Sequence, residues 1–142
     1  MKISGILDRK GTSVVTTGPA TSVTEFLQLL ARHNIGAVVV VADQRPVGII
    51  SERDVALRLA EAGAAALDQP VSELMSSELI TCTAEDPLED VAMLMTDRRI
   101  RHLPVLAGAE LAGIVSIGDV VAARLRELEQ TQAQLESYIT HG

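Results

Sequence analysis

The 142-residue chain is 47% apolar and 22% charged with a net charge of −7, which predicts a folded globular protein and excludes disorder. The acidic balance argues against a surface for duplex nucleic acid, and two aromatic residues without any Trp exclude a surface that stacks successive bases. One cysteine, Cys82, excludes an internal disulfide and favours a reducing compartment. No apolar run approaches the length of about 18 residues that spans a membrane, and residues 1–10 lack the layout of a signal peptide. We therefore expect a cytoplasmic protein that interacts with neither nucleic acid nor membrane.

The chain contains an internal repeat with an offset of 65 residues. Residues 35–55 align with residues 100–120 without a gap and share eight identities in 21 positions. A unit of about 60 residues buries its own apolar face poorly, so we expect the two copies to pack together as one body. The identities include the pairs Gly48 and Gly113, Ser51 and Ser116, and Asp54 and Asp119.

Each copy has the pattern of strand, helix, strand, strand, helix. Short runs of β-branched residues predict the strands, and apolar residues at helical spacing after a capping box or an Asp-Pro pair predict the helices. In the first copy we expect a strand at 13–16, a helix after Ser22-x-x-Glu25, a hairpin of 37–41 and 47–50 turning at 43–46, and a helix from Ser51. In the second copy we expect a helix from Asp86-Pro87, a hairpin of 103–106 and 111–115 turning at 107–110, and a helix from about 118 to about 138.

These patterns divide the chain into four parts. We expect a first repeat at 6–62, a linker at 63–78 with a short helix near 71–75, a second repeat at 79–126, and a helical extension with a tail at 127–142. The last helix carries apolar residues between charged ones and is long enough to leave its own repeat. We expect it to pack across a homodimer, with a single solvated helix as the alternative.

Ser51 and Asp54, and likewise Ser116 and Asp119, lie one turn apart where a strand meets a helix. Such a pair is typical of a helix cap, in which the hydroxyl accepts a free N–H and the carboxylate complements the helix dipole. The same geometry suits a ligand, because a carboxylate accepts bonds from ribose hydroxyls and a helix N-terminus attracts phosphate. The repetition does not decide between the two interpretations.

The second copy carries the basic residues that an anion needs. Arg101 and His102 precede its hairpin, whereas the first copy has Gly36 and Ala37 there, so the two copies are not equivalent. We expect a phosphate to bind in the second copy, with Arg53 as an additional cation. Pro104 removes a backbone donor from its strand, which favours a sheet edge and also suits backbone facing a ligand. No metal-ligand spacing, phosphate loop or nucleophile motif occurs, so we expect no metal, no catalytic cofactor and no enzyme activity.

With these residues the chain resembles a tandem CBS-domain protein (a Bateman module) of the small kind that stands alone. The resemblance rests on Gly-Ile-Ile-Ser-Glu-Arg-Asp at 48–54, Ile-Arg-His-Leu-Pro-Val at 100–105 and Gly-Ile-Val-Ser-Ile-Gly-Asp at 113–119. It implies an α/β (α+β) fold of two repeats, each a three-stranded sheet with two helices, packed pseudo-symmetrically. It also implies a homodimer and an adenosine ligand bound between the repeats.

The resemblance implies a non-catalytic sensor that binds AMP, or ADP, ATP or NAD(H), and acts on an unknown regulated protein. Asp119 and Asp54 would hold ribose hydroxyls, and Ser116 and Ser51 would lie near ribose or phosphate. The other implied residues are Arg101 and His102 for phosphate, Ile100, Leu79, Ile80 and Thr81 for adenine, Pro104 on the second-copy strand, and Thr16 in the first copy. The first copy is expected to be empty or to accept a phosphate only with Arg53 or Lys10. The alternatives are a structural dimerisation module whose Ser-x-x-Asp motifs are only caps and, with less support, a nucleotide-hydrolysing enzyme.

Overall fold

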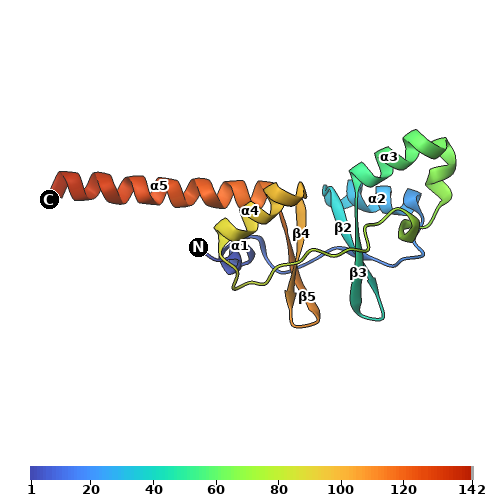
Figure 1. The fold of residues 1–142 in the computed structure, drawn as a ribbon, viewed down its shortest axis with the longest axis horizontal. Coiled ribbons are helices and arrows are strands. Elements are labelled where there is room, and N and C mark those ends of the chain that lie inside the picture. The colour runs from blue at the N-terminus through green and yellow to red at the C-terminus, as the bar shows by residue number, and fades with distance from the viewer. Residues whose placement is uncertain (142) are drawn as a thin grey trace. The chain divides into compact units, whose positions relative to one another are not determined.

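Short β-branched runs form strands and amphipathic segments form helices throughout residues 1–141, the part of the chain described by this computed structural model (Figure 1). The expected mixed fold of helices and strands is confirmed. The elements in chain order are α1 (Ile3–Lys10), β1 (Thr16–Thr17), α2 (Val23–His33), β2 (Ala37–Ala42), β3 (Arg45–Ser51), α3 (Glu52–Ala62), the 3₁₀ helices η1 (Gly63–Asp68) and η2 (Val71–Glu73), α4 (Leu88–Arg98), β4 (His102–Ala107), β5 (Glu110–Ser116) and α5 (Ile117–His141).

The chain divides into two compact units. The first-repeat unit comprises Ser13–Ile80 with Gly108–Ala112. The second-repeat unit comprises Met1–Thr12, Thr81–Ala107 and the chain from Gly113 onward. The repeat boundaries expected at 6–62, 63–78, 79–126 and 127–142 follow sequence similarity rather than compactness, and they stay a prediction.

In the first-repeat unit, β1 lies parallel to β2, and β2 lies antiparallel to β3. Val38 and Val40 point to the same face of β2, as residues two apart on a strand do, and pack with Phe26 of α2 in the core. The turn between β2 and β3 is shorter than the expected 43–46, because Asp43 and Gln44 both adopt positive φ, of 50° and 65°. Two such residues form the tight turn that matches the twist of a hairpin, so β3 already begins at Arg45.

In the second-repeat unit, β4 pairs with β5 in a two-stranded sheet. Cys82 adds a single parallel bridge to Val105, and this bridge corresponds, at the offset of 65 residues, to the pairing of Thr17 with Val40. The first strand that the repeat pattern predicts for the second copy is therefore reduced to one bridging residue, whereas β1 pairs through two residues. Helix α4 begins at Leu88 with Pro87 at its N-cap, and Asp86, the acid of the Asp-Pro pair, accepts the N–H of Thr83 at 2.9 Å.

Helix α1 was not expected from the sequence, and it completes the second-repeat unit. Ile3, Ile6 and Leu7 are buried on one of its faces. The backbone of residues 1–4, where α1 begins, bonds to the residues at the start of α4 as residues 69–72 bond to the start of α2. In the second-repeat unit the N–H to carbonyl bonds are Ile3 to Asp86 (3.0 Å), Leu88 to Met1 (2.9 Å) and Ser4 to Ala84 (2.8 Å). The bonds that match them, in the same order, in the first-repeat unit are Val71 to Thr21 (2.8 Å), Val23 to Gln69 (2.9 Å) and Ser72 to Pro19 (3.1 Å).

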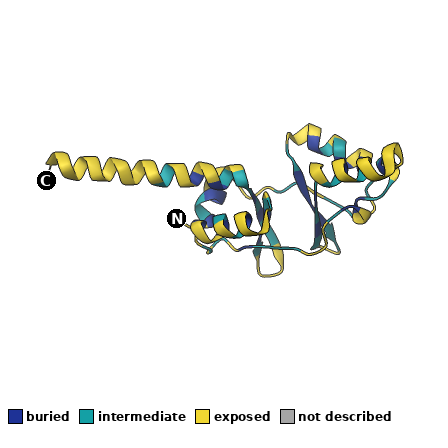
Figure 2. Ribbon diagram, turned by 45° about the horizontal axis from the view of Figure 1, so that its top comes forward, coloured by how far each residue is buried: buried dark blue, intermediate teal, exposed yellow. Residues whose placement is uncertain are grey.

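Burial varies strongly along the second-repeat unit. Figure 2 shows buried residues in the hairpin and an exposed surface along most of α5. Val120 and Ala123 are the residues of α5 that are buried. Across the described residues 1–141, none of the helices combines the length and the apolar character that a bilayer span requires. No group of three or more His, Cys, Asp or Glu residues in the same range is arranged to hold a metal ion.

Candidate functional site

The pair Ser116 and Asp119 lies at the junction of β5 and α5. The Ser116 N–H donates to Oδ2 of Asp119 at 2.8 Å, and the Asp119 N–H donates to Oγ of Ser116 at 3.1 Å. These reciprocal bonds satisfy two amide donors at the start of the helix and fix the carboxylate over its positive end. The motif is a helix cap, as its local pattern predicts.

Ser51 and Asp54 form the same arrangement at the junction of β3 and α3. The Ser51 N–H donates to Oδ2 of Asp54 at 2.8 Å, and the Asp54 N–H donates to Oγ of Ser51 at 3.4 Å. The Ser51 hydroxyl also donates to Oδ2 of Asp54 at 3.1 Å. The internal repeat therefore reproduces one local structure in both compact units.

Asp119 has a further partner that the cap does not require. Nζ of Lys10, at the end of α1, lies 2.7 Å from Oδ2 of Asp119 and donates to the carbonyl of Ile114 at 2.9 Å. Partial burial alone raises the pKa of Asp119, but the hydrogen bonds from Lys10 and Ser116 and the charge of Lys10 outweigh it, and the pKa is lowered. The carboxylate is thus ionised near neutral pH and remains 26% exposed. Residues 69–72 of the first-repeat unit bond as residues 1–4 do, which is an offset of 68 residues, so Glu78 stands at the position that matches Lys10 and supplies no cation.

The backbone of Arg101 joins this cluster. The N–H of Ile117, the first residue of α5, donates to the Arg101 carbonyl at 2.8 Å. The equivalent bond of the first-repeat unit runs from the Glu52 N–H to the Gly36 carbonyl at 3.0 Å. The Arg101 residue is exposed, whereas His102 and Ile100 are half-buried. The structure therefore brings Lys10, Ser116, Asp119 and Arg101 together at the start of α5.

The remaining expected site residues are distributed over both compact units. Pro104 is buried, and its carbonyl accepts the N–H of Cys82 at 3.0 Å, so this carbonyl faces backbone. Thr81 is half-buried in the second-repeat unit. The first-repeat unit holds half-buried Ser51, Asp54, Leu79 and Ile80, and exposed Arg53 and Thr16. The ligand roles of all these residues stay a prediction. Lys10, expected to assist the first copy, contacts the carboxylate of the second copy.

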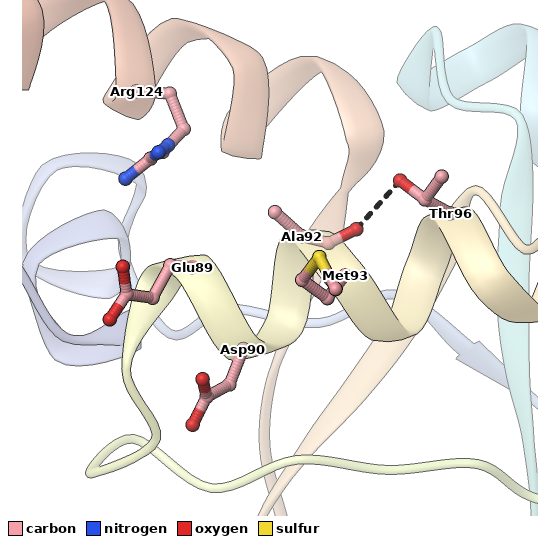
Figure 3. A pocket seen from close by; sticks show the side chains of 6 residues that line it. All are labelled: Glu89, Asp90, Ala92, Met93, Thr96 and Arg124. Atoms are coloured by element: carbon pink, nitrogen blue, oxygen red, sulfur yellow. Dashed lines mark hydrogen bonds between the residues drawn. The ribbon is translucent and has the colours of Figure 1, made fainter.

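An open groove of about 390 Å³ lies between α4 and α5 (Figure 3). Its lining contains none of the expected nucleotide-binding residues. In Figure 3 the Arg124 guanidinium is directed toward the end of α4 that carries Glu89, and Met93 is 64% exposed. The helical spacing of the buried residues of α4 could have indicated that Met93 lies on the exposed face, but the groove itself depends on how two helices that are distant in the sequence pack. The lining residues are Glu89, Asp90, Ala92, Met93, Thr96 and Arg124.

Cys82 has the properties of a structural thiol. It is 3% exposed, and burial, with a smaller effect of the Asp86 charge, raises its pKa from 9.0 to about 12. A thiol attacks as the thiolate, so we expect native Cys82 to be unreactive toward a thiol reagent at neutral pH and to react once the chain is unfolded.

The same shift predicts a loss of stability in alkali. Above pH 9 the unfolded chain releases the thiol proton while the folded chain keeps it, so the free energy of unfolding falls until about pH 12. The fall due to this group is at most about 1.4 kcal/mol for each pH unit. Urea unfolding at a series of alkaline pH values should show a shallower fall for Cys82→Ala than for the unsubstituted protein. Equal slopes would contradict the raised pKa.

Comparisons with known proteins agree with this architecture. A family model described as CBS domain matches residues 4–61 and 71–126. The CBS domain-containing protein YhcV of Bacillus subtilis (strain 168) is 36% identical over 123 residues, which are 87% of this chain and 87% of that protein. The crystal structure of the CBS-domain containing protein ATU1752 from Agrobacterium tumefaciens has a TM-score of 0.85 and 45% identity, and the match covers 87% of this chain and 99% of that one.

A third protein adds information about ligands. The CBS domain pair of protein MJ0100 was solved in complex with 5′-methylthioadenosine and S-adenosyl-L-methionine. It is 27% identical, with a TM-score of 0.78, and the match covers 91% of this chain and 98% of that one. The residues of this chain after 126 lie outside the family-model match.

Proposed function

Because the chain belongs to the CBS-domain family as a tandem pair of domains, we propose that it is a non-catalytic regulatory module that binds an adenine nucleotide. AMP is the favoured ligand, and ADP, ATP and NAD(H) are related candidates. The observation that carries the proposal is the ionised, partly exposed carboxylate of Asp119, fixed at the junction of β5 and α5. The adenosine ligands of the MJ0100 domain pair support the ligand class.

Each group at the start of α5 has a role that its chemistry allows. The Asp119 carboxylate accepts hydrogen bonds from the two ribose hydroxyls. The Ser116 hydroxyl and the positive end of α5 lie near ribose or phosphate. Exposed Arg101, with His102, pairs with the phosphate, since a guanidinium binds phosphate oxygens through paired N–H groups. Lys10 adds a second positive charge beside the carboxylate.

Adenine is held by aliphatic side chains in this proposal. The chain has no Trp and its single Phe, Phe26, is fully buried, so Tyr138 is the one accessible ring and there is no pair of rings between which the base could stack. Buried apolar contact with branched side chains stabilises a flat base through the hydrophobic effect instead. The residues proposed for this role are Ile100, Leu79, Ile80 and Thr81, all half-buried.

The first copy is the weaker site in this proposal. Ser51 and Asp54 repeat the cap geometry, but Gly36 and Ala37 replace the basic pair and Glu78 stands at the position that matches the lysine. Arg53 is then the cation available for a phosphate, with Thr16 at the position that matches Thr81.

A nucleotide that binds one arrangement of the repeats better than another would shift the population toward that arrangement and so alter a regulated partner. A cytoplasmic location is part of the same proposal.

In each capping box the serine and the aspartate already bond to each other, which favours a second candidate, a structural module without a small ligand. The ultraviolet spectrum of the purified protein separates the two, because a chain with one Tyr and no Trp absorbs weakly. A co-purified nucleotide would dominate the spectrum in the adenine band. Isothermal titration should show heat on addition of AMP, and ligand at about 100 times its Kd should stabilise the fold by about 2.7 kcal/mol. Absence of heat and of a thermal shift with AMP, ADP, ATP and NAD(H) would leave the structural module.

A further inference from the structure

The outer face of α5 carries an unpartnered apolar stripe with a regular spacing. Val121, Leu125, Leu128, Leu135 and Ile139 are between 50% and 79% exposed. Together with position 132 they recur at alternating steps of four and three residues, which is the a/d repeat of a coiled coil. Leu125, Gln132 and Ile139 occupy a positions, and Val121, Leu128 and Leu135 occupy d positions. The 25-residue helix holds about three and a half heptads.

The opposite face of the same helix is already occupied. Val120 and Ala123 are buried against the body of the second-repeat unit, and Glu127 lies 3.0 Å from the N-terminal ammonium of Met1. These residues fall at c and f positions, away from the stripe. The body therefore uses one face of α5 and leaves the heptad face to another partner, and residues 128–141 are all exposed.

We infer that α5 of one chain pairs with α5 of a second copy as a parallel, in-register, two-stranded coiled coil over residues 121–139. Leucine at d positions favours two strands. In a parallel pair Arg124 at g lies beside Glu129 of the partner subunit at e, so opposite charges face each other across the seam. Arg124 now pairs with Glu127 of its own helix at 3.1 Å, and the partner's Glu129 would share this guanidinium.

The antiparallel arrangement is disfavoured by two features of the same stripe. With residues 121–139 fully paired, it would place Glu129 beside Glu129 of the partner subunit, both at e, so that like charges would meet. It would also pack an a residue against d residues, so Gln132 would face leucine and lose its hydrogen bonds. In the parallel arrangement Gln132 faces its own copy, and the two amides bond to each other, which also fixes the register.

Sedimentation equilibrium of the whole protein without nucleotide tests the pairing. The unsubstituted protein should have the mass of two chains, and Leu128→Lys with Leu135→Lys should halve it. Gln130→Lys with Ser137→Lys is the matched control, because it adds the same charges at exposed f positions and should remain a dimer. All four positions are exposed in the single chain, so neither variant should alter its fold, which circular dichroism checks. A monomeric or trimeric unsubstituted protein, or a dimeric leucine variant, would overturn the inference.

Disulfide trapping tests the direction of the helices. Leu125→Cys at a and Leu135→Cys at d, made separately, should each form a covalent dimer on mild oxidation, since each residue faces its own copy in the parallel register, whereas an antiparallel pair would place residue 125 against residue 135. Gln130→Cys at f should not, and buried Cys82 gives little background. Crosslinking only in a mixture of the two variants would show antiparallel helices and overturn the parallel assignment. Neither experiment uses a nucleotide, so its outcome is independent of the proposed function.

Discussion

Asp119→Asn is expected to weaken AMP binding by about two orders of magnitude or more. A hydrogen bond to a charged acceptor contributes about 1.5–3 kcal/mol, and the proposed ribose contact has two of them. A loss of about 3 kcal/mol corresponds to roughly a hundredfold change in Kd. Asparagine keeps the size of the side chain, and its carbonyl still accepts the Ser116 N–H that now bonds to Oδ2. Isothermal titration of the folded variant measures the effect.

Asp86→Asn is the matched control for this substitution. Asp86 is also a carboxylate of the second-repeat unit that accepts a backbone N–H, from Thr83 at 2.9 Å, and it has no proposed contact with the ligand. Its variant should bind AMP with an unchanged Kd. Asp54→Asn then reports on the first copy and should remove at most the weaker binding event. Normal binding by the Asp119 variant would show that the pair of Ser116 and Asp119 is only a cap.

The sequence predicts those parts of the fold that depend on neighbouring residues. Both hairpins and the capping boxes depend on residues a few positions apart, and Ser22 indeed accepts the Glu25 N–H at 3.1 Å. The pairing of Ser116 with Asp119 is of the same local kind. The residues that specify these features are close together in the sequence, which is why their pattern is sufficient to find them.

Contacts between distant segments are what the sequence pattern does not contain. Lys10 and Asp119 are 109 positions apart, and no spacing rule connects them. Ile3, Ile6 and Leu7 have helical spacing that could have indicated α1, but the segment is short, and residues 1–4 bond to the distant start of α4. The electrostatics of the candidate site thus depend on a helix that joins the repeat from the other end of the chain.

The glycine shared by both copies provides the second large expected effect. A Cβ on Gly48 would clash with the sulfur of Met75 and lie 2.9 Å from the carbonyl oxygen of Ser76. That carbonyl belongs to a backbone bridge, in which Ile49 and Ser76 exchange N–H···O bonds of 3.0 and 2.9 Å. Backbone cannot move aside without breaking the bridge. Gly48→Ala should therefore lower the free energy of unfolding by about 3 kcal/mol, from overpacking and weakened bonds.

Gly113→Ala is expected to have a smaller effect, although the two positions are identical in the repeat. Its Cβ would meet only Cδ2 of Leu7 at 2.7 Å, with the other neighbours at 3.6 Å or more, and the tip of a leucine can rotate away. We expect a loss of about 1 kcal/mol. Gly18→Ala is the control, since it has open space and no positive φ, and it should change stability by less than about 0.5 kcal/mol. Urea unfolding of the three variants gives the order, and an equal loss at Gly48 and Gly113 would show that the bridge at Ser76 yields as easily as a side chain.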